Sequence, residues 1–142
     1  MKRIFFIFLA VVMTSGISFS EAYISAEERT RILTEMKEAQ NQAISGMKEI
    51  HREVLAKIKL AEMMAKTSPF ATDNKEINKQ IKKCFENAAR DFKEISRLIL
   101  EAIGEIRQGC LNFTKIEERT KKIDELEKSA VNFMAEGIRL SR

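Results

Sequence analysis

Residues 73–109, DNKEINKQIKKCFENAARDFKEISRLILEAIGEIRQG, decide the fold of this 142-residue chain. Apolar residues recur along this stretch at steps of only three and four positions: Ile77, Ile81, Phe85, Ala88, Phe92, Ile95, Ile99, Ala102 and Ile106. Residues at that spacing share one face of an α-helix, so the stretch predicts a long amphipathic helix over residues 74–108. Asp73 begins a capping box with Glu76, and Gly109 suits the left-handed stop of a helix.

A second stripe of the same kind precedes this stretch and predicts a helix over residues 26–66. Ser25 and Glu28 form a capping box at its start, and Pro69 lies in the break that follows it. Gly46 interrupts the stripe at a cost of about 1 kcal/mol relative to alanine, yet the apolar residues keep their phase through it. We therefore expect one continuous helix, with a bend near Gly46 as the alternative.

A third stripe predicts a helix over residues 115–140, for which Thr114 and Glu117 make a further capping box. Short connections favour antiparallel neighbours, so the sequence predicts an all-α protein, an elongated antiparallel three-helix bundle. A four-helix bundle is the alternative if the first helix bends near Gly46. The third helix is too short to cover the other two, which would be about 60 and 50 Å long. Monomers rarely expose such an apolar seam, and this favours self-association or a protein partner.

The start of the chain has the layout of a secretory signal peptide over residues 1–22. A positive start precedes an uninterrupted apolar run over residues 4–13 (IFFIFLAVVM), and small residues then suit cleavage after Ser20 or Ala22. The run has about half of the 20 residues that a membrane-spanning helix needs. We therefore expect a secreted product without a transmembrane anchor, extracellular or, in a bacterium, periplasmic.

The remainder, residues 23–142, is expected to form a single helical domain. The whole chain has 25 Lys and Arg against 21 Asp and Glu, a net charge of +4. Cleavage after Ser20 removes Lys2 and Arg3, which leaves 23 cations against 21 anions and a net charge of +2. We expect these charges to be spread over solvated helix faces, not gathered in the basic face that nucleic-acid binding requires, so no nucleic-acid partner is expected.

Cys84 and Cys110 are the two cysteines of the chain, and an exported chain with two cysteines invites a disulfide. A straight helix would hold them about 39 Å apart, whereas a disulfide needs Cα atoms within about 7 Å. We therefore expect no bond between them within one chain. Each is expected to form an intermolecular disulfide, with a second copy or another protein, or to remain a free thiol. Cys84, next to Phe85, also fits a small apolar core residue.

Other candidate sites are sparse. Asn112, with Phe113 and Thr114, matches the N-glycosylation sequon and lies in a predicted turn, which matters in a eukaryotic secretory pathway. His51 is the single histidine and lies at the edge of the first apolar stripe, where a packing or solvent-exposed role is expected. We expect no catalytic residues, no cofactor and no metal site, because metal ligands and nucleophile–histidine pairs need more histidines or closely spaced cysteines.

These observations favour a small secreted, non-enzymatic helical protein that acts by protein–protein interaction, with self-association as one form of it. A carrier of lipid or another apolar ligand is the alternative, because an interior containing several methionines can open a cavity. A third interpretation is a surface-active toxin or effector component whose amphipathic helices lie in a membrane interface.

Overall fold

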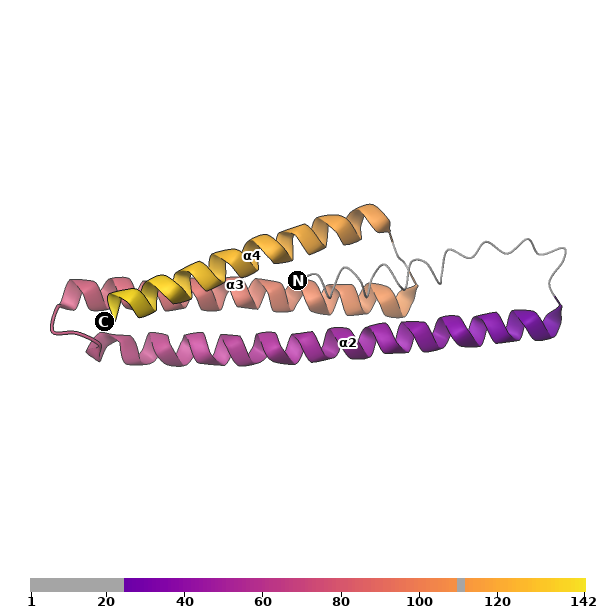
Figure 1. Cartoon of the computed structure of the whole chain (residues 1–142), viewed down its shortest axis with the longest axis horizontal. Helices are drawn as coiled ribbons and strands as arrows, with labels where there is room; N and C mark the ends of the chain where they lie inside the picture. The colour runs from indigo at the N-terminus through magenta and orange to yellow at the C-terminus, as the bar shows by residue number, and fades with distance from the viewer. Residues whose placement is uncertain (1–24, 110–111) are drawn as a thin grey trace.

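The computed structural model describes residues 25–109 and 112–142, and within them it contains three long helices and one short one (Figure 1). These are α2 (Ala26–Thr67), the 3₁₀ turn η1 (Ser68–Phe70), α3 (Lys75–Gln108) and α4 (Phe113–Leu140). Successive long helices run in opposite directions beside one another. The predicted all-α, antiparallel three-helix bundle is confirmed.

The predicted signal peptide over residues 1–22, with its cleavage after Ser20 or Ala22, lies outside the described residues, and so does Cys110. In the part of the chain that the structure describes, none of the helices combines the length and the apolar content that a membrane crossing requires.

The first long helix, α2, is continuous through Gly46, so the bend that would give a four-helix bundle does not occur. It begins after Ser25, whose side-chain oxygen accepts a hydrogen bond from the Glu28 amide at 3.2 Å, as the capping box predicts. Met47 and Ile50, which follow Gly46 on the core face, are almost fully buried. Burying two such side chains stabilises the helix by more than the roughly 1 kcal/mol that the glycine costs.

The N-cap of α3 is Asn74, whereas the sequence predicted Asp73. The Asn74 side chain accepts hydrogen bonds from the amides of Glu76 (2.9 Å) and Ile77 (3.2 Å). The preceding turn sets this register, because the Thr72 hydroxyl bonds both the amide and the carbonyl of Asn74. At its other end α3 stops as predicted, with Gly109 in the left-handed conformation at φ 69°.

The N-cap of α4 is also displaced from its predicted position, from Thr114 to Asn112. The Asn112 side-chain oxygen accepts from the Lys115 amide at 3.2 Å. Asparagine caps a helix at least as well as threonine, and a cap at residue 112 adds Phe113 and Thr114 to the helix.

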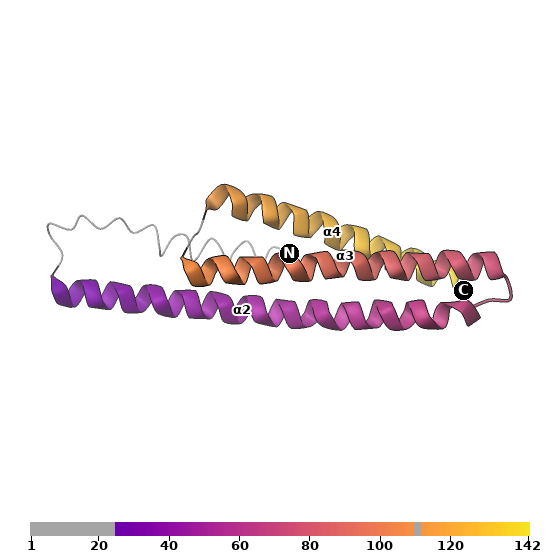
Figure 2. The same ribbon diagram turned by 180° about the vertical axis from the view of Figure 1, so that it is seen from behind.

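The core is built around α3, which contributes 14 buried residues, whereas α2 contributes seven and α4 five. Both α2 and α4 pack along α3 and meet each other at far fewer points. One of these points is an ion pair between Lys57 on α2 and Glu127 on α4, 3.6 Å apart. Figure 2 shows α4 crossing α3 at an angle, with its C-terminal end near the turn that joins α2 to α3. The two outer helices therefore flank α3 and leave a second, uncovered side to the α2–α3 pair.

The turn between α2 and α3 is held by the buried side chain of Asn78. Its amide nitrogen donates to the carbonyls of Pro69 (3.0 Å) and Thr72 (2.7 Å). Its oxygen accepts from the Thr72 amide (2.9 Å) and the Thr72 hydroxyl (2.8 Å). Because all four hydrogen-bonding positions of the amide are used, this connection is fixed and the two helices are held in register.

Candidate functional site

The first candidate is the α2 overhang, residues 26–39, which extends past the end of α3. The Gln40 side-chain amide donates to the Ile106 carbonyl, so position 40 of α2 lies beside the last turn of α3. The apolar stripe continues into the overhang, but Leu33 is 60% exposed. The other three stripe residues are only half-buried: Ile32, Met36 and Ala39. Within the described residues α3 does not reach these three side chains, so they stay partly exposed.

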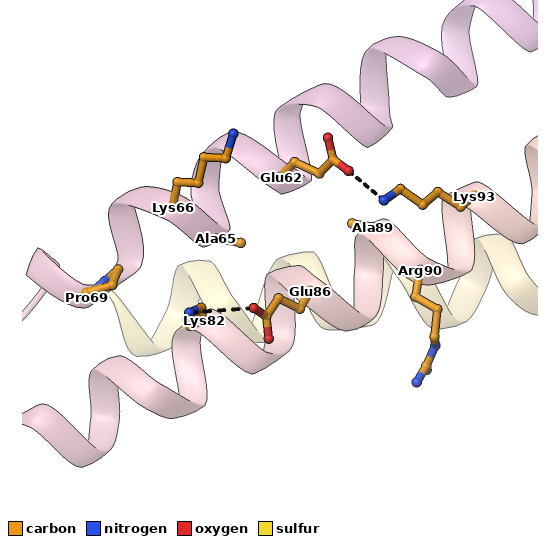
Figure 3. A pocket seen from close by; sticks show the side chains of 9 residues that line it. All are labelled: Glu62, Ala65, Lys66, Pro69, Lys82, Glu86, Ala89, Arg90 and Lys93. Atoms are coloured by element: carbon orange, nitrogen blue, oxygen red, sulfur yellow. Dashed lines mark ion pairs between the residues drawn. The ribbon is translucent and has the colours of Figure 1, made fainter.

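A second candidate is an open pocket of about 720 Å³ between α2 and α3, near the turn (Figure 3). Ala65 and Ala89 form its apolar floor, and both are nearly buried. Glu62 pairs with Lys93 across the two helices at 2.6 Å, and this contact lowers the pKa of the Glu62 carboxyl. The remaining charged residues of the lining are Lys66, Lys82, Glu86 and Arg90, of which Lys82 and Glu86 pair at 3.8 Å.

A third candidate is a pocket of about 570 Å³ between α2 and α3 at the far end of α3. Its polar and apolar lining comes from four residues of α2: Gln40, Asn41, Ile44 and Ser45. Its charged residues are all cations, and all three are exposed: Lys48, Arg52 and Arg107.

The two pockets lie on one continuous surface, which we call the α2–α3 groove. Residues spaced by seven positions lie along one line of a helix. On α2, one such line consists of Asn41, Lys48, Leu55 and Glu62. On α3, the matching line is Arg107, Leu100, Lys93 and Glu86. Each line begins in one pocket and ends in the other, with an exposed leucine between them. The groove therefore consists of the two pocket linings together with Leu55 and Leu100.

The α2–α3 groove concentrates positive charge. The linings of its two pockets include seven Lys or Arg side chains and two Glu side chains. This differs from the even spread of charge that the sequence predicted. The net charge of the chain hides the asymmetry, because the acidic residues that balance these cations lie mostly on other faces of the helices.

The opposite side of the α2–α3 pair faces α4 and is closed by paired polar groups. The Arg119 guanidinium donates two hydrogen bonds to the Glu105 carboxylate, both at 2.7 Å, and its side chain is only 11% exposed. These bonds lower the pKa of Glu105 and raise that of Arg119. The Ser129 hydroxyl donates to the buried Asp91 carboxylate at 2.6 Å. Such pairs fix the position of α4 on α3.

Cys84 is a free thiol and is half-buried on α3. Burial raises the pKa of its thiol, and the nearby Glu136 carboxylate raises it further. The reactive thiolate is therefore less populated than in an exposed cysteine. Because α3 is continuous up to Gln108, the premise that a straight helix extends from Cys84 toward residue 110 holds. The absence of an intrachain bond remains a prediction.

The other two predicted sites each have a clear structural setting. His51 is half-buried, and its Nε2 lies 2.7 Å from the Ser96 hydroxyl, so it links α2 to α3. Ser96 could not be predicted as its partner from the sequence. Asn112 is exposed and caps α4 through its side-chain oxygen, which leaves the amide nitrogen for a glycan.

Among residues 25–109 and 112–142, no three His, Cys, Asp or Glu side chains come together in a way that could hold a metal ion. No protein-family model, curated protein or solved structure matches the chain.

Proposed function

We propose that this chain is a small secreted, non-enzymatic helical protein that acts by protein–protein interaction and self-associates through the α2 overhang. The observation that carries the proposal is Leu33, which is 60% exposed on the face that continues the core stripe of α2. An apolar helix face that continues a core beyond its partner helix is a typical protein contact surface.

The length and charge of the overhang favour a second copy as its partner. Its 14 residues make a surface about 21 Å long. Acidic and basic residues alternate along it, as in the pairs that Arg31 makes with Glu28 (3.7 Å) and Glu35 (3.9 Å). Two such surfaces placed antiparallel about a two-fold axis at Leu33 bury the same apolar residues on both sides and place Arg31 of each copy opposite Glu35 of the other. The surface is small compared with the roughly 800 Å² per partner of a standard interface, so we expect micromolar association.

The packing of the methionines speaks against the carrier of apolar ligands. Met47 is fully buried, and Met64 and Met134 pack against the core clusters. These side chains therefore fill the core, where a carrier would need them to line an empty cavity. The surface-active interpretation rests on amphipathic helices alone, a property that every bundle helix shares.

Native mass spectrometry of the full secreted product, collected from an expressing host, tests the proposal. We expect a mixture of monomer and dimer without bound lipid. A monomer that carries a co-purified lipid would support the carrier instead. Dye release from vesicles at low protein concentration provides the second test, because release would favour the surface-active interpretation and contradict the proposal.

A further inference from the structure

The α2–α3 groove lies on the side of this helix pair that faces away from α4. Leu55 lies in the groove, while Lys57, two positions later and about 200° around the helix, pairs with Glu127 of α4. On α3, Lys93 lies in the groove, while Asp91, two positions earlier and therefore about 200° around the helix, accepts a hydrogen bond from Ser129 of α4. The groove is therefore distinct from the surface that α4 covers, and it is separate from the α2 overhang.

The positive charge of the groove is only partly compensated. Glu62 and Glu86 neutralise Lys93 and Lys82. Arg90 pairs with Asp91 at 3.3 Å and points away from the pocket (Figure 3). At the far end, no ion pair joins Lys48, Arg52 or Arg107 to a carboxylate within the residues that the structure describes. Since like charges on one face repel each other, an occupant with negative charge along its flanks would be favoured there.

The floor of the groove combines apolar residues with one polar contact, where His51 meets Ser96 across the two helices at 2.7 Å. Leu55 is 40% exposed and Leu100 is 53% exposed, and both lie midway between the two pockets. Ala65 and Ala89 continue the floor at one end, and Ile44 continues it at the other. A purely polyanionic ligand would leave these leucines in water, whereas a helix with an apolar stripe would bury them.

The shape of the groove also fits a helix. Two antiparallel helices present a trough along their line of contact, and a further helix that lies in it would complete a three-helix bundle. From residue 41 to residue 66 of α2 the trough is about 38 Å long. It therefore has room for a helix of about 20 to 25 residues.

We propose that the α2–α3 groove binds an acidic amphipathic helix of a partner protein. The apolar stripe of that helix covers Leu55 and Leu100, and its flanking carboxylates meet the cations at the two ends of the groove. This inference rests on the proposed protein–protein function but does not depend on self-association.

The test uses two synthetic, fluorescently labelled helical peptides of about 20 residues, long enough to span most of the groove. Both carry leucine at heptad positions a and d. One has glutamate at most other positions, and its charge-reversed counterpart has lysine there. Binding to the full secreted chain is followed by fluorescence anisotropy at low and moderate salt. We expect the acidic peptide to bind at least about tenfold more tightly than the basic peptide, with an affinity that falls as salt is added.

Two kinds of variant separate a docked helix from general attraction of anions. Lys48→Glu combined with Arg52→Glu removes charge from one end, and we expect it to weaken binding of the acidic peptide about tenfold. Leu55→Gln combined with Leu100→Gln keeps every charge, and we expect a loss of similar size. Lys121→Glu combined with Lys128→Glu, which changes two exposed cations of α4, is the matched control and should leave affinity unchanged.

Three results would overturn the inference: equal binding of the two peptides, an unchanged affinity in the leucine variant, or equal losses in the groove and control variants. A short DNA duplex and vesicles with anionic lipid serve as competitors. If either displaces the peptide and binds the leucine variant as tightly as the original chain, the groove is a polyanion or membrane site instead. Dimerisation measured on the same samples reports on the proposed function, so the two can fail separately.

Discussion

The Phe85 ring on α3 lies directly against Gly137 on α4. A Cβ atom at position 137 would come within 2.8 Å of the Phe85 Cζ atom, closer than real Cβ contacts allow. Phe85 is 2% exposed and belongs to the core cluster beside the turn between α2 and α3. The absence of a side chain at Gly137 is therefore what lets the end of α4 approach α3 so closely.

Gly137→Ala should lower the free energy of unfolding by about 1–2 kcal/mol, because the overpacking outweighs the gain in helix propensity. Gly104→Ala is the matched control, since a Cβ there meets nothing within 4 Å. It lies inside α3 and should stabilise the protein by about 0.5–1 kcal/mol. Urea denaturation of both variants provides the measurement. Stabilisation by both substitutions would show that α4 does not depend on this contact.

The Arg119–Glu105 pair should make stability depend on acid pH. Arg119 lowers the pKa of Glu105, so the unfolded chain takes up the proton at a higher pH than the folded chain does. The stabilisation is therefore present above the pKa of an unfolded glutamate, about 4.3, and is lost as pH falls through the lower pKa of the folded state.

Glu105→Gln should cost about 1–2 kcal/mol at pH 7, and this difference from the original chain should shrink below about pH 4. Glu125→Gln, at an exposed position of α4, serves as the control and should have little effect. Denaturant midpoints measured between pH 3 and pH 7, a span of about four units around the glutamate pKa, supply the test. A difference that stays constant across that span would exclude the pair as its source.

Asn112 caps α4, and the sequon predicts that it also carries a glycan; substitutions can separate the cap from the predicted glycan. Asn112→Ala removes the cap of α4 and should cost about 1 kcal/mol, whereas Asn112→Asp keeps a capping oxygen and should cost much less. Both substitutions, and Thr114→Ala, destroy the sequon. In a eukaryotic secretory host, intact mass should therefore fall by one glycan in all three variants. An unchanged mass would show that the sequon is not used.

Cys84 should react slowly with thiol reagents in the folded chain. With Cys110→Ser to leave a single thiol, alkylation by iodoacetamide should be several-fold slower in the native protein than in urea, because burial and Glu136 raise the thiol pKa. Equal alkylation rates in the native protein and in urea would contradict the half-buried position of Cys84 and its raised thiol pKa. For the original chain, a non-reducing gel that shows only monomer without free thiols would contradict the prediction of no intrachain disulfide.

The helices could be predicted from the sequence because each carries a long apolar stripe in unbroken phase. The unbroken stripe of α2 favoured one continuous helix over a bend near Gly46, and the helix is continuous. The caps were less predictable, since Asn74 and Asn112 compete with neighbouring Asp73 and Thr114 for the same role. Which residue becomes the N-cap depends on hydrogen bonds in the preceding turn, such as those that Thr72 makes with Asn74.

The candidate sites were harder to predict, because they depend on how the helices align. A mismatch in helix length was evident, but the contact between Gln40 and Ile106 determines that the mismatch appears at the start of α2. Likewise, the cations that line the α2–α3 groove come from two antiparallel helices and are far apart in the sequence. A net charge of only +4 did not indicate that they would meet on one face.

Sedimentation velocity of the original chain and two matched leucine variants tests self-association through the α2 overhang most directly. Leu33 is 60% exposed in the overhang, and Leu60 is 45% exposed on α2 outside it. Over concentrations that span the micromolar range, we predict a monomer–dimer equilibrium for the original chain and for Leu60→Glu, and a monomer for Leu33→Glu. A monomer at every concentration for the original chain, or a dimer that persists in Leu33→Glu, would contradict this account.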